Sequence, residues 1–145
     1  MTDLTTVNVQ TTHTDGRFIA QARDQFLVTD STVSRGGTEE AWTAGELLLA
    51  ALGTCTVSSV TFYARETSAP LADVSAATSY ARDPDDPTRY SYVALEVTTQ
   101  GVSQEVAEHL VRLYTENCPV FGTVSRGAVI SVTVRAETPA DVLKA

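Results

Sequence analysis

The stretch over residues 43–66 constrains the fold most, because it is long, apolar and free of proline. It reads TAGELLLAALGTCTVSSVTFYARE and carries no charged side chain over residues 47–64. We expect a single helix that is hydrophobic on nearly every side. Such a helix has to be covered by other parts of the protein.

An uncharged run of this length reaches the lower limit for a membrane span, so a transmembrane helix is the first alternative. Two features argue against it. No second hydrophobic segment flanks the run, and hydroxyl groups lie within it at Thr54, Thr56, Ser58, Ser59, Thr61 and Tyr63. We therefore interpret the stretch as the central helix of a soluble core and expect no membrane partner.

Length and composition predict one globular domain, residues 1–145. A chain of 145 residues can bury a substantial core but is short for two domains. Its 43% hydrophobic and 19% charged residues are typical of globular proteins and not of disordered ones. The formal net charge is −8 and the 10 basic residues are scattered, so we expect no nucleic acid partner.

The N-terminal sequence MTDLTTVNVQ lacks the basic segment and apolar run of a secretory signal, so we expect a cytoplasmic protein. In a reducing compartment the two cysteines, Cys55 and Cys118, are expected as thiols rather than as a structural disulfide. They are then either inert core residues or a redox pair.

Turn and strand signals before the central helix predict an antiparallel meander. Two or three strands are expected over residues 4–29, with a turn at Asp15-Gly16. The polar residues 30–41 are expected as a loop. Thr43 is a plausible N-cap of the central helix, with Glu46 in its first turn.

After the central helix, strands over residues 71–82 and 89–100 flank the turn sequence DPDDPT and predict a long hairpin, with Val93, Leu95 and Val97 on its buried face. A second helix follows over residues 103–117. Pro119 then predicts a short helix with Cys118 at its N-cap. A strand over residues 128–136 and a weak helical turn close the chain. The order predicts an α+β fold of antiparallel strands packed on two main helices.

The two cysteines are the candidates for chemistry. A mid-helix cysteine such as Cys55 in apolar surroundings has a raised pKa and is unreactive unless a cation favours its thiolate. Cys118 is better placed, because the N–H groups and dipole of a following helix stabilise a thiolate. His13 and His109 have no metal-ligand spacing with either cysteine, so we expect neither a metal nor another cofactor.

Both cysteine contexts carry a resemblance. The segment ELLLAALGTCT around Cys55, the sequence NCPV at Cys118 and the strand that follows resemble the OsmC/Ohr superfamily of osmotically inducible and organic hydroperoxide resistance proteins. The resemblance covers nearly the whole chain. It implies an OsmC-like fold in an intertwined homodimer, with the central helix buried and the active sites at the subunit interface.

The resemblance also implies a catalytic cycle. Cys55 would be the peroxidatic cysteine that attacks the terminal oxygen of an organic hydroperoxide, and Cys118 would resolve the resulting sulfenic acid as a disulfide. A dithiol reductant, in the family often a lipoylated protein, would restore both thiols. The substrate would be an organic hydroperoxide or another small apolar molecule.

Charged residues that support the thiolate are also implied by the resemblance. In the family's peroxidases an arginine holds the thiolate, and a glutamate ten residues before the cysteine orients that arginine. Here Gly45 stands ten residues before Cys55 and Glu46 stands nine, about 180° round a regular helix from the cysteine. Glu46 could serve from a non-helical start of the segment, or Glu39 or Glu40 could replace it.

Two arginines are candidates for the cation. Arg17 lies in the first hairpin, and Arg35 lies in the loop beside Gly36-Gly37, from which it could swing over a thiolate. As the cation that holds the Cys55 thiolate, we favour Arg35 slightly over Arg17. For both residues the alternative is a solvated surface charge.

The leading prediction is therefore a cytoplasmic homodimeric thiol peroxidase with Cys55 as nucleophile and Cys118 as resolving cysteine. The alternative is an OsmC-fold dimer that binds a small hydrophobic molecule or senses redox state without efficient peroxidase activity. Gly45 at the glutamate position motivates that alternative. A third possibility is that both cysteines are purely structural.

Overall fold

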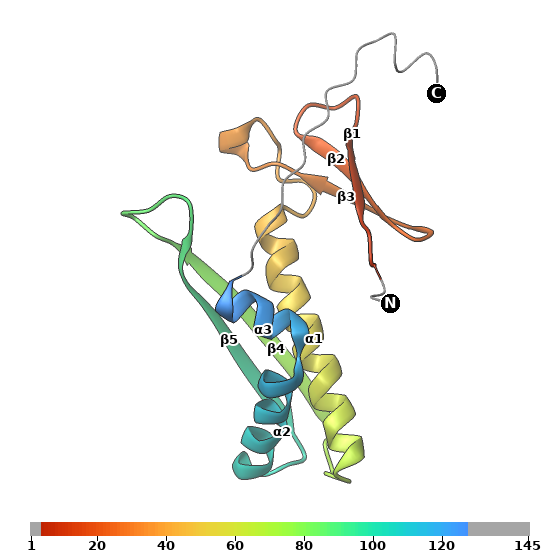
Figure 1. Cartoon of the computed structure of the whole chain (residues 1–145), viewed down its shortest axis with the longest axis vertical. Helices are drawn as coiled ribbons and strands as arrows, with labels where there is room; N and C mark the ends of the chain where they lie inside the picture. The colour runs from red at the N-terminus through yellow and green to blue at the C-terminus, as the bar shows by residue number, and fades with distance from the viewer. Residues whose placement is uncertain (1–3, 128–145) are drawn as a thin grey trace.

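Three strands, a long helix, a hairpin and two shorter helices follow one another along the chain (Figure 1). The computed structural model describes residues 4–127. The predicted strand over residues 128–136 and the predicted turn after it lie outside these residues. The elements are β1 (Asn8–Thr11), β2 (Arg17–Ala22), β3 (Gln25–Asp30), η1 (Val33–Arg35), α1 (Ala44–Glu66), β4 (Asp73–Arg82), β5 (Tyr90–Gln100), α2 (Gln104–Asn117) and α3 (Pro119–Arg126).

The N-terminal strands form an antiparallel sheet in the order β1-β2-β3, which confirms the predicted meander. The turn before β2 contains Gly16, which has a φ of 73°. A Cβ atom on Gly16 would lie 2.6 Å from the Cα atom of Gly37. The close approach of the loop after β3 therefore requires glycine at this turn.

The long helix begins where the cap signals place it. The Glu46 carboxylate accepts hydrogen bonds from the backbone N–H of Thr43, at 2.7 Å, and from its hydroxyl, at 2.8 Å. These contacts fix the first turn of α1. The helix then continues without interruption to Glu66.

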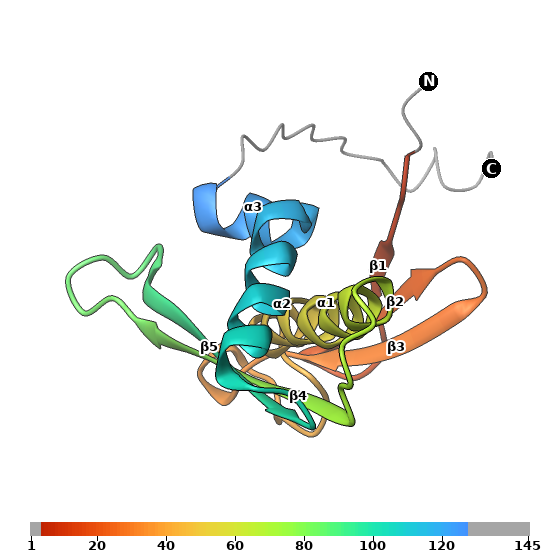
Figure 2. The ribbon, with the colours of Figure 1, turned by 90° about the horizontal axis from the view of Figure 1, so that it is seen from below.

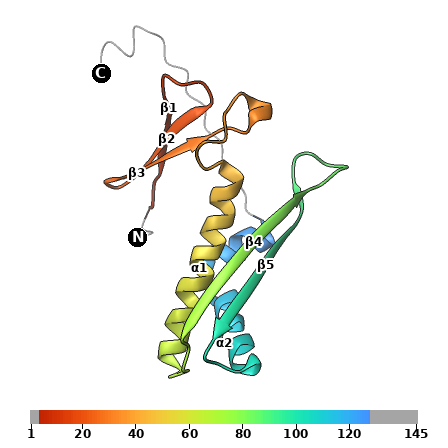
Figure 3. The same ribbon diagram turned by 180° about the vertical axis from the view of Figure 1, so that it is seen from behind.

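The remaining elements pack along α1. Strands β4 and β5 form an antiparallel hairpin, and β4 runs beside the helix (Figure 3). Figure 2 shows α1 nearly end-on, with α2 beside it and β4 beneath it. Ser103 caps α2 by accepting a hydrogen bond from the Val106 N–H at 3.3 Å. The α+β class and both main helices are as predicted.

The core lies between α1 and α2. Its fully or almost fully buried apolar side chains are Val60, Ala64, Leu110 and Tyr114. The buried residues of α1 recur every fourth position, at Leu52, Thr56, Val60 and Ala64. A spacing of four residues marks a single stripe of a helix. The described part of one chain therefore covers only one side of α1, although its sequence is apolar nearly all round.

Large apolar side chains remain exposed on the N-terminal sheet. Val9 is 62% exposed and Phe26 is 68% exposed, and the neighbours Leu27 and Val28 are also exposed. Successive strand residues point to opposite faces, so both faces of β3 present apolar surface. In Figure 1 this sheet extends beyond the N-terminal end of α1.

The hairpin differs from the prediction in one respect. Leu95 and Val97 are partly buried, as expected, but Val93 is 39% exposed. Val93 lies opposite Tyr80 near the turn of the hairpin, and this end of the hairpin extends past the helices in Figure 1. The alternating pattern predicted the buried face correctly but not how far along the strand it is covered.

By length and composition α1 could also cross a membrane. Its hydroxyl groups bond within the helix: Thr56 Oγ1 donates to the Leu52 carbonyl at 2.8 Å, and Thr61 Oγ1 donates to the Val57 carbonyl at 2.8 Å. The helix also packs on β4, α2 and α3. We therefore interpret α1 as the core helix of a small soluble domain.

Candidate active site

The structure brings the two cysteines together. Cys55 lies in the middle of α1, and Cys118 lies at the junction of α2 and α3. Both are free, partly buried thiols, and both pack against the core cluster that contains Tyr114. Two residues 63 positions apart in sequence thus share one apolar site.

Cys118 has the N-cap position that Pro119 predicts. Its backbone N–H donates to the Tyr114 carbonyl at 2.9 Å, which ends α2, and Pro119 begins α3. The Phe121 N–H donates to the Cys118 Sγ atom at 3.5 Å. The sulfur thus lies at the N-terminal end of α3 and accepts a hydrogen bond from one of its free backbone N–H groups.

Cys55 lies in a less favourable environment for ionisation. Burial raises the pKa of its thiol, and the neighbouring Cys118 thiol raises it further. Within residues 4–127 no cationic side chain counteracts this effect on the pKa. In the described part of a single chain, Cys55 is therefore held as the neutral thiol.

Tyr114 completes the apolar site. Its side chain is fully buried and packs edge-on against Phe121, with the ring centroids 5.5 Å apart. Burial raises the pKa of the Tyr114 hydroxyl, Thr56 lowers it, and both cysteines raise it. The sequence pattern identifies Tyr114 only as an apolar position of α2. Its placement one helical turn before Cys118 is the signal that could have marked it as a site residue.

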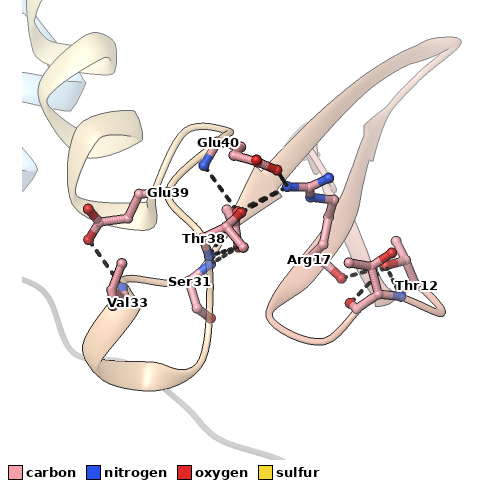
Figure 4. Close-up of polar contacts among 9 residues, drawn as sticks. Thr12, Arg17, Ser31, Val33, Thr38, Glu39 and Glu40 are labelled. Atoms are coloured by element: carbon pink, nitrogen blue, oxygen red, sulfur yellow. Dashed lines mark hydrogen bonds and ion pairs between the residues drawn. The ribbon is translucent and has the colours of Figure 1, made fainter.

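A second site, which is polar, lies at the N-terminal end of α1 (Figure 4). One nitrogen of Arg17, Nη2, donates to Glu40 Oε2 at 2.7 Å, Thr38 Oγ1 at 3.0 Å and Asp30 Oδ2 at 3.3 Å. We call Arg17, Asp30, Thr38 and Glu40 the ionic cluster. It joins β2 to the loop that leads into α1.

Asp30 is the buried centre of the ionic cluster, with only 1% of its side chain exposed. Its Oδ2 atom accepts a hydrogen bond from the Thr38 hydroxyl at 2.7 Å. This bond, together with those from Arg17 and the backbone N–H groups of Thr38 and Glu40, lowers the pKa of Asp30 to about 2. The hydrogen bond from Arg17 lowers the pKa of Glu40 as well.

The ionic cluster and the thiols are well separated along one chain. Cys55 lies eleven residues after Ala44, the first residue of α1, which corresponds to roughly 16 Å along the helix axis. The cluster lies before that first residue (Figure 4). Arg17 therefore cannot contact the Cys55 sulfur of its own chain.

Arg35 is not part of the ionic cluster. It ends η1, is exposed, and lines a cavity of about 610 Å³ with Gly45 and Tyr80 among the other lining residues. The structure therefore places Arg17 in an arginine–glutamate pair and Arg35 at an open surface. Within residues 4–127 neither arginine is brought to Cys55, so the choice between them stays a prediction.

Comparison with known families agrees with the fold. The sequence model of the OsmC-like protein family matches residues 37–133. The chain belongs to the OsmC-like protein family. No curated protein matches the chain in sequence.

Several solved structures share this OsmC-like fold. A hypothetical protein from Aquifex aeolicus VF5 matches with a TM-score of 0.73 at 18% identity, over 87% of this chain and 90% of its own. An osmotic stress induced and detoxification response protein from Psychrobacter arcticus 273-4 gives 0.70 at 25% identity, over 85% and 90%. The organic hydroperoxide resistance protein OsmC from Legionella pneumophila gives 0.69 at 23% identity, over 86% and 90%.

For this OsmC-like chain, the structure explains why glycine occupies position 45. A Cβ atom there would overlap the hydroxyl of Tyr80 and would lie 3.0 Å from its Cζ atom. Tyr80 is itself stacked on Tyr90, with centroids 3.9 Å apart. A glutamate at position 45 would therefore require the Tyr80 side chain to shift from this tyrosine pair.

The three acidic candidates of this OsmC-like chain have different partners. Glu46 lies in the regular first turn of α1 and is engaged with Thr43, so the non-helical start that would bring it toward Cys55 does not occur. Glu39 accepts a hydrogen bond from the Val33 N–H at 3.3 Å. Glu40 instead pairs with Arg17 and is the acid that accompanies the candidate cation.

Proposed function

We propose that this protein is a thiol peroxidase that reduces organic hydroperoxides through a Cys55/Cys118 dithiol–disulfide cycle. The observation that carries the proposal is the shared site of the two free thiols. A cysteine that is oxidised beside a second thiol is trapped as a disulfide before it oxidises further. The Legionella pneumophila structure, named for organic hydroperoxide resistance, supports the choice of substrate.

The first step is nucleophilic attack. The Cys55 thiolate attacks the terminal oxygen of the hydroperoxide, so an S–O bond forms and the O–O bond breaks. The alkoxide leaves and takes a proton to become an alcohol. The sulfur is oxidised to a sulfenic acid, while the peroxide is reduced.

The second step uses the neighbouring thiol. The Cys118 thiolate attacks the Cys55 sulfur, the S–S bond forms, and hydroxide leaves with a proton as water. The hydrogen bond from the Phe121 N–H holds the Cys118 sulfur at the N-terminal end of α3. A dithiol reductant, for which a lipoylated protein is a candidate, then exchanges with the disulfide and restores both thiols.

We also propose that the working unit is a homodimer. The uncovered sides of α1 and the exposed apolar faces of the N-terminal sheet are larger than scattered surface residues require. A second copy of the chain would cover them. It would also let the ionic cluster of one subunit approach Cys55 of the other, which the separation along one chain prevents.

In this arrangement the partner's Arg17 would lower the pKa of Cys55. A guanidinium close to a thiolate favours the charged form and opposes the effect of burial. Glu40 and Asp30 would hold that arginine in position. The proposed compartment is the cytoplasm, where a dithiol reductant keeps the resting cysteines reduced.

The test is a steady-state assay with cumene hydroperoxide and dihydrolipoamide. The wild-type protein should turn over, and Cys55→Ser should lose at least about 1,000-fold in kcat/KM because the nucleophile is gone. Cys118→Ser should still consume one equivalent of peroxide and stop with a sulfenic acid on Cys55, visible by intact mass. Equal turnover by wild type and Cys55→Ser would refute the peroxidase function.

The second candidate function is a binding or redox-sensing dimer with the same fold. The raised pKa of Cys55 in the described chain favours it, because a neutral thiol reacts slowly with peroxide. A wild-type protein that fails to turn over peroxide but forms the Cys55–Cys118 disulfide slowly under oxidant would support this candidate. Small apolar molecules retained through purification would then be sought by mass spectrometry.

A further inference from the structure

The Tyr114 hydroxyl is a buried polar group in the core between α1 and α2. The residue is 0% exposed, and its oxygen has no partner of good geometry within the described part of the chain. Burying a hydroxyl unpaired is unfavourable compared with burying the phenyl ring alone. Plain core packing would be served better by phenylalanine, so the hydroxyl calls for a partner that the resting thiol state does not supply.

The position of this hydroxyl is fixed by its surroundings. Tyr114 lies one turn before Cys118 on α2, and its carbonyl accepts the Cys118 N–H at 2.9 Å. Its ring packs edge-on against Phe121 and belongs to the same buried cluster as Leu110 and Val60. Both thiols pack against that cluster, so the hydroxyl and the two sulfurs share one enclosed region.

The neighbouring hydroxyl does not satisfy Tyr114 either. Thr56 follows Cys55 on α1 and is fully buried. Its proton is already used, because Thr56 Oγ1 donates to the Leu52 carbonyl at 2.8 Å. The Thr56 oxygen could still accept, but no Tyr114–Thr56 hydrogen bond of good geometry forms within residues 4–127, so the proton of the Tyr114 hydroxyl is free there for an acceptor that forms at the thiols.

We propose that the Tyr114 hydroxyl donates a hydrogen bond to the Cys55 thiolate and is thereby a further catalytic residue of the dithiol site. When Cys55 loses its proton, the sulfur becomes a strong acceptor beside an unused donor. Its catalytic consequence rests on the proposed peroxidase function, whereas the hydrogen bond itself does not. No electron or group is transferred to the tyrosine, which acts only as a donor.

The groups that can act on Cys55 from the surrounding elements are few. Cys118 faces it from the α2–α3 junction, Tyr114 from α2, and Tyr63 packs against the same cluster from α1. Within residues 4–127 no charged side chain perturbs the Cys55 thiol. Tyr63 is thus a matched control, since its hydroxyl can be removed from the same cluster by the same chemical change.

The experiment compares Tyr114→Phe with Tyr63→Phe in the full-length protein. The rate of iodoacetamide alkylation of Cys55 is followed against pH by peptide mass spectrometry, alongside peroxidase activity and thermal unfolding. Tyr114→Phe should slow alkylation at neutral pH roughly ten- to hundred-fold by raising the pKa of Cys55, since a charge-assisted hydrogen bond is lost. Its Tm should equal or exceed that of the wild type. Tyr63→Phe should alkylate within about twofold of the wild type.

Equal alkylation profiles for Tyr114→Phe and the wild type would overturn the proposal. If the wild type turns over no peroxide, the proposed function fails while the alkylation comparison still decides the role of Tyr114. Should Tyr114→Phe not fold, 3-fluorotyrosine at position 114 replaces it. Its more acidic hydroxyl is a stronger donor and should speed alkylation by about two- to threefold, and an unchanged rate would overturn the proposal.

Discussion

The dithiol site and the ionic cluster of one chain provide opposite environments for charge. Around Cys55 the surroundings are apolar, and burial raises the pKa of the thiol. Around Asp30 five hydrogen-bond donor atoms converge on one carboxylate, and its pKa falls to about 2. Within residues 4–127 the Cys55 thiol thus has no cation beside it, whereas Arg17 of the same chain is paired with two carboxylates.

This difference between the two sites explains how such a chain can fold before its thiol becomes reactive. Burying an arginine and a thiolate together in the core of a monomer would be costly, because both charges lose their hydration. Here Arg17 is instead paired with Glu40 and Asp30 of its own chain, while burial holds Cys55 as the neutral thiol. Association of two chains would then supply the charge that activates the thiol.

The largest effect is expected in a subunit complementation test, which asks whether Arg17 of one subunit activates Cys55 of the other. Arg17→Ala should lower kcat/KM for cumene hydroperoxide by about 100-fold, because the Cys55 thiolate loses its cation. Cys55→Ser should be inactive. Mixed dimers of the two variants should regain activity, since one site combines an intact Cys55 with the partner's intact Arg17.

The control for complementation is a mixture of Cys55→Ser with the double variant Arg17→Ala/Cys55→Ser, which contains no intact nucleophile. Mixed dimers of the single variants that remain as inactive as each parent would show that Arg17 does not act across the interface. Dimer exchange would be verified by native mass spectrometry of differently tagged chains.

The contribution of the ionic cluster to stability is tested by measuring Tm as a function of pH. Asp30 has an unfolded pKa near 3.9 and a folded pKa of about 2. Because the folded pKa is the lower one, the stabilisation is fully present above about pH 4 and is lost as the pH falls toward about 2. Asp30→Asn should lower Tm by about 5 °C or more at pH 7 and should flatten its dependence on pH below 4.

Asp24→Asn is the matched control for this measurement, since Asp24 is an exposed residue in the turn between β2 and β3. It should leave both Tm and its pH dependence close to those of the wild type. A wild-type acid transition that persists unchanged in Asp30→Asn would assign the pH dependence to other carboxylates.

The fold could be predicted largely from local signals. Thr43, Ser103 and Pro119 mark helix starts through backbone chemistry that involves only a few neighbouring residues. The alternation of Leu95 and Val97 likewise needs no knowledge of the rest of the chain. The exposure of Val93 was not predicted, because it depends on how much of the strand is covered by residues distant in the sequence.

Within the candidate site, only the residues that belong to a sequence motif could be predicted. Cys55 and Cys118 stand in recognisable sequence contexts, but the pairing of Arg17 with Glu40 joins residues 23 positions apart. Arg35 beside two glycines was an equally reasonable choice from local sequence. Tyr114 was missed as a site residue because its helical spacing is that of any core position, and only the structure shows its unpaired hydroxyl.

The smallest effect is expected from substitution of Gly45, where α1 meets the hairpin of β4 and β5. Gly45→Ala should destabilise the protein by about 1–3 kcal/mol in urea unfolding, because the new Cβ overlaps the Tyr80 hydroxyl. Gly53→Ala is the matched control on the same helix. Its nearest neighbouring atom would be Thr78 Cγ2 at 3.8 Å, so this change should stabilise by roughly 0.5–1 kcal/mol through helix propensity.

A double-mutant cycle assigns the Gly45 effect to its cause. In a Tyr80→Phe background the overlapping hydroxyl is absent, while the Tyr80 ring position near residue 45 remains. The cost of Gly45→Ala should therefore fall by about 1 kcal/mol but not vanish. An identical cost in both backgrounds would mean that Tyr80 does not exclude a side chain at position 45, and the absence of a glutamate there would need another physical reason.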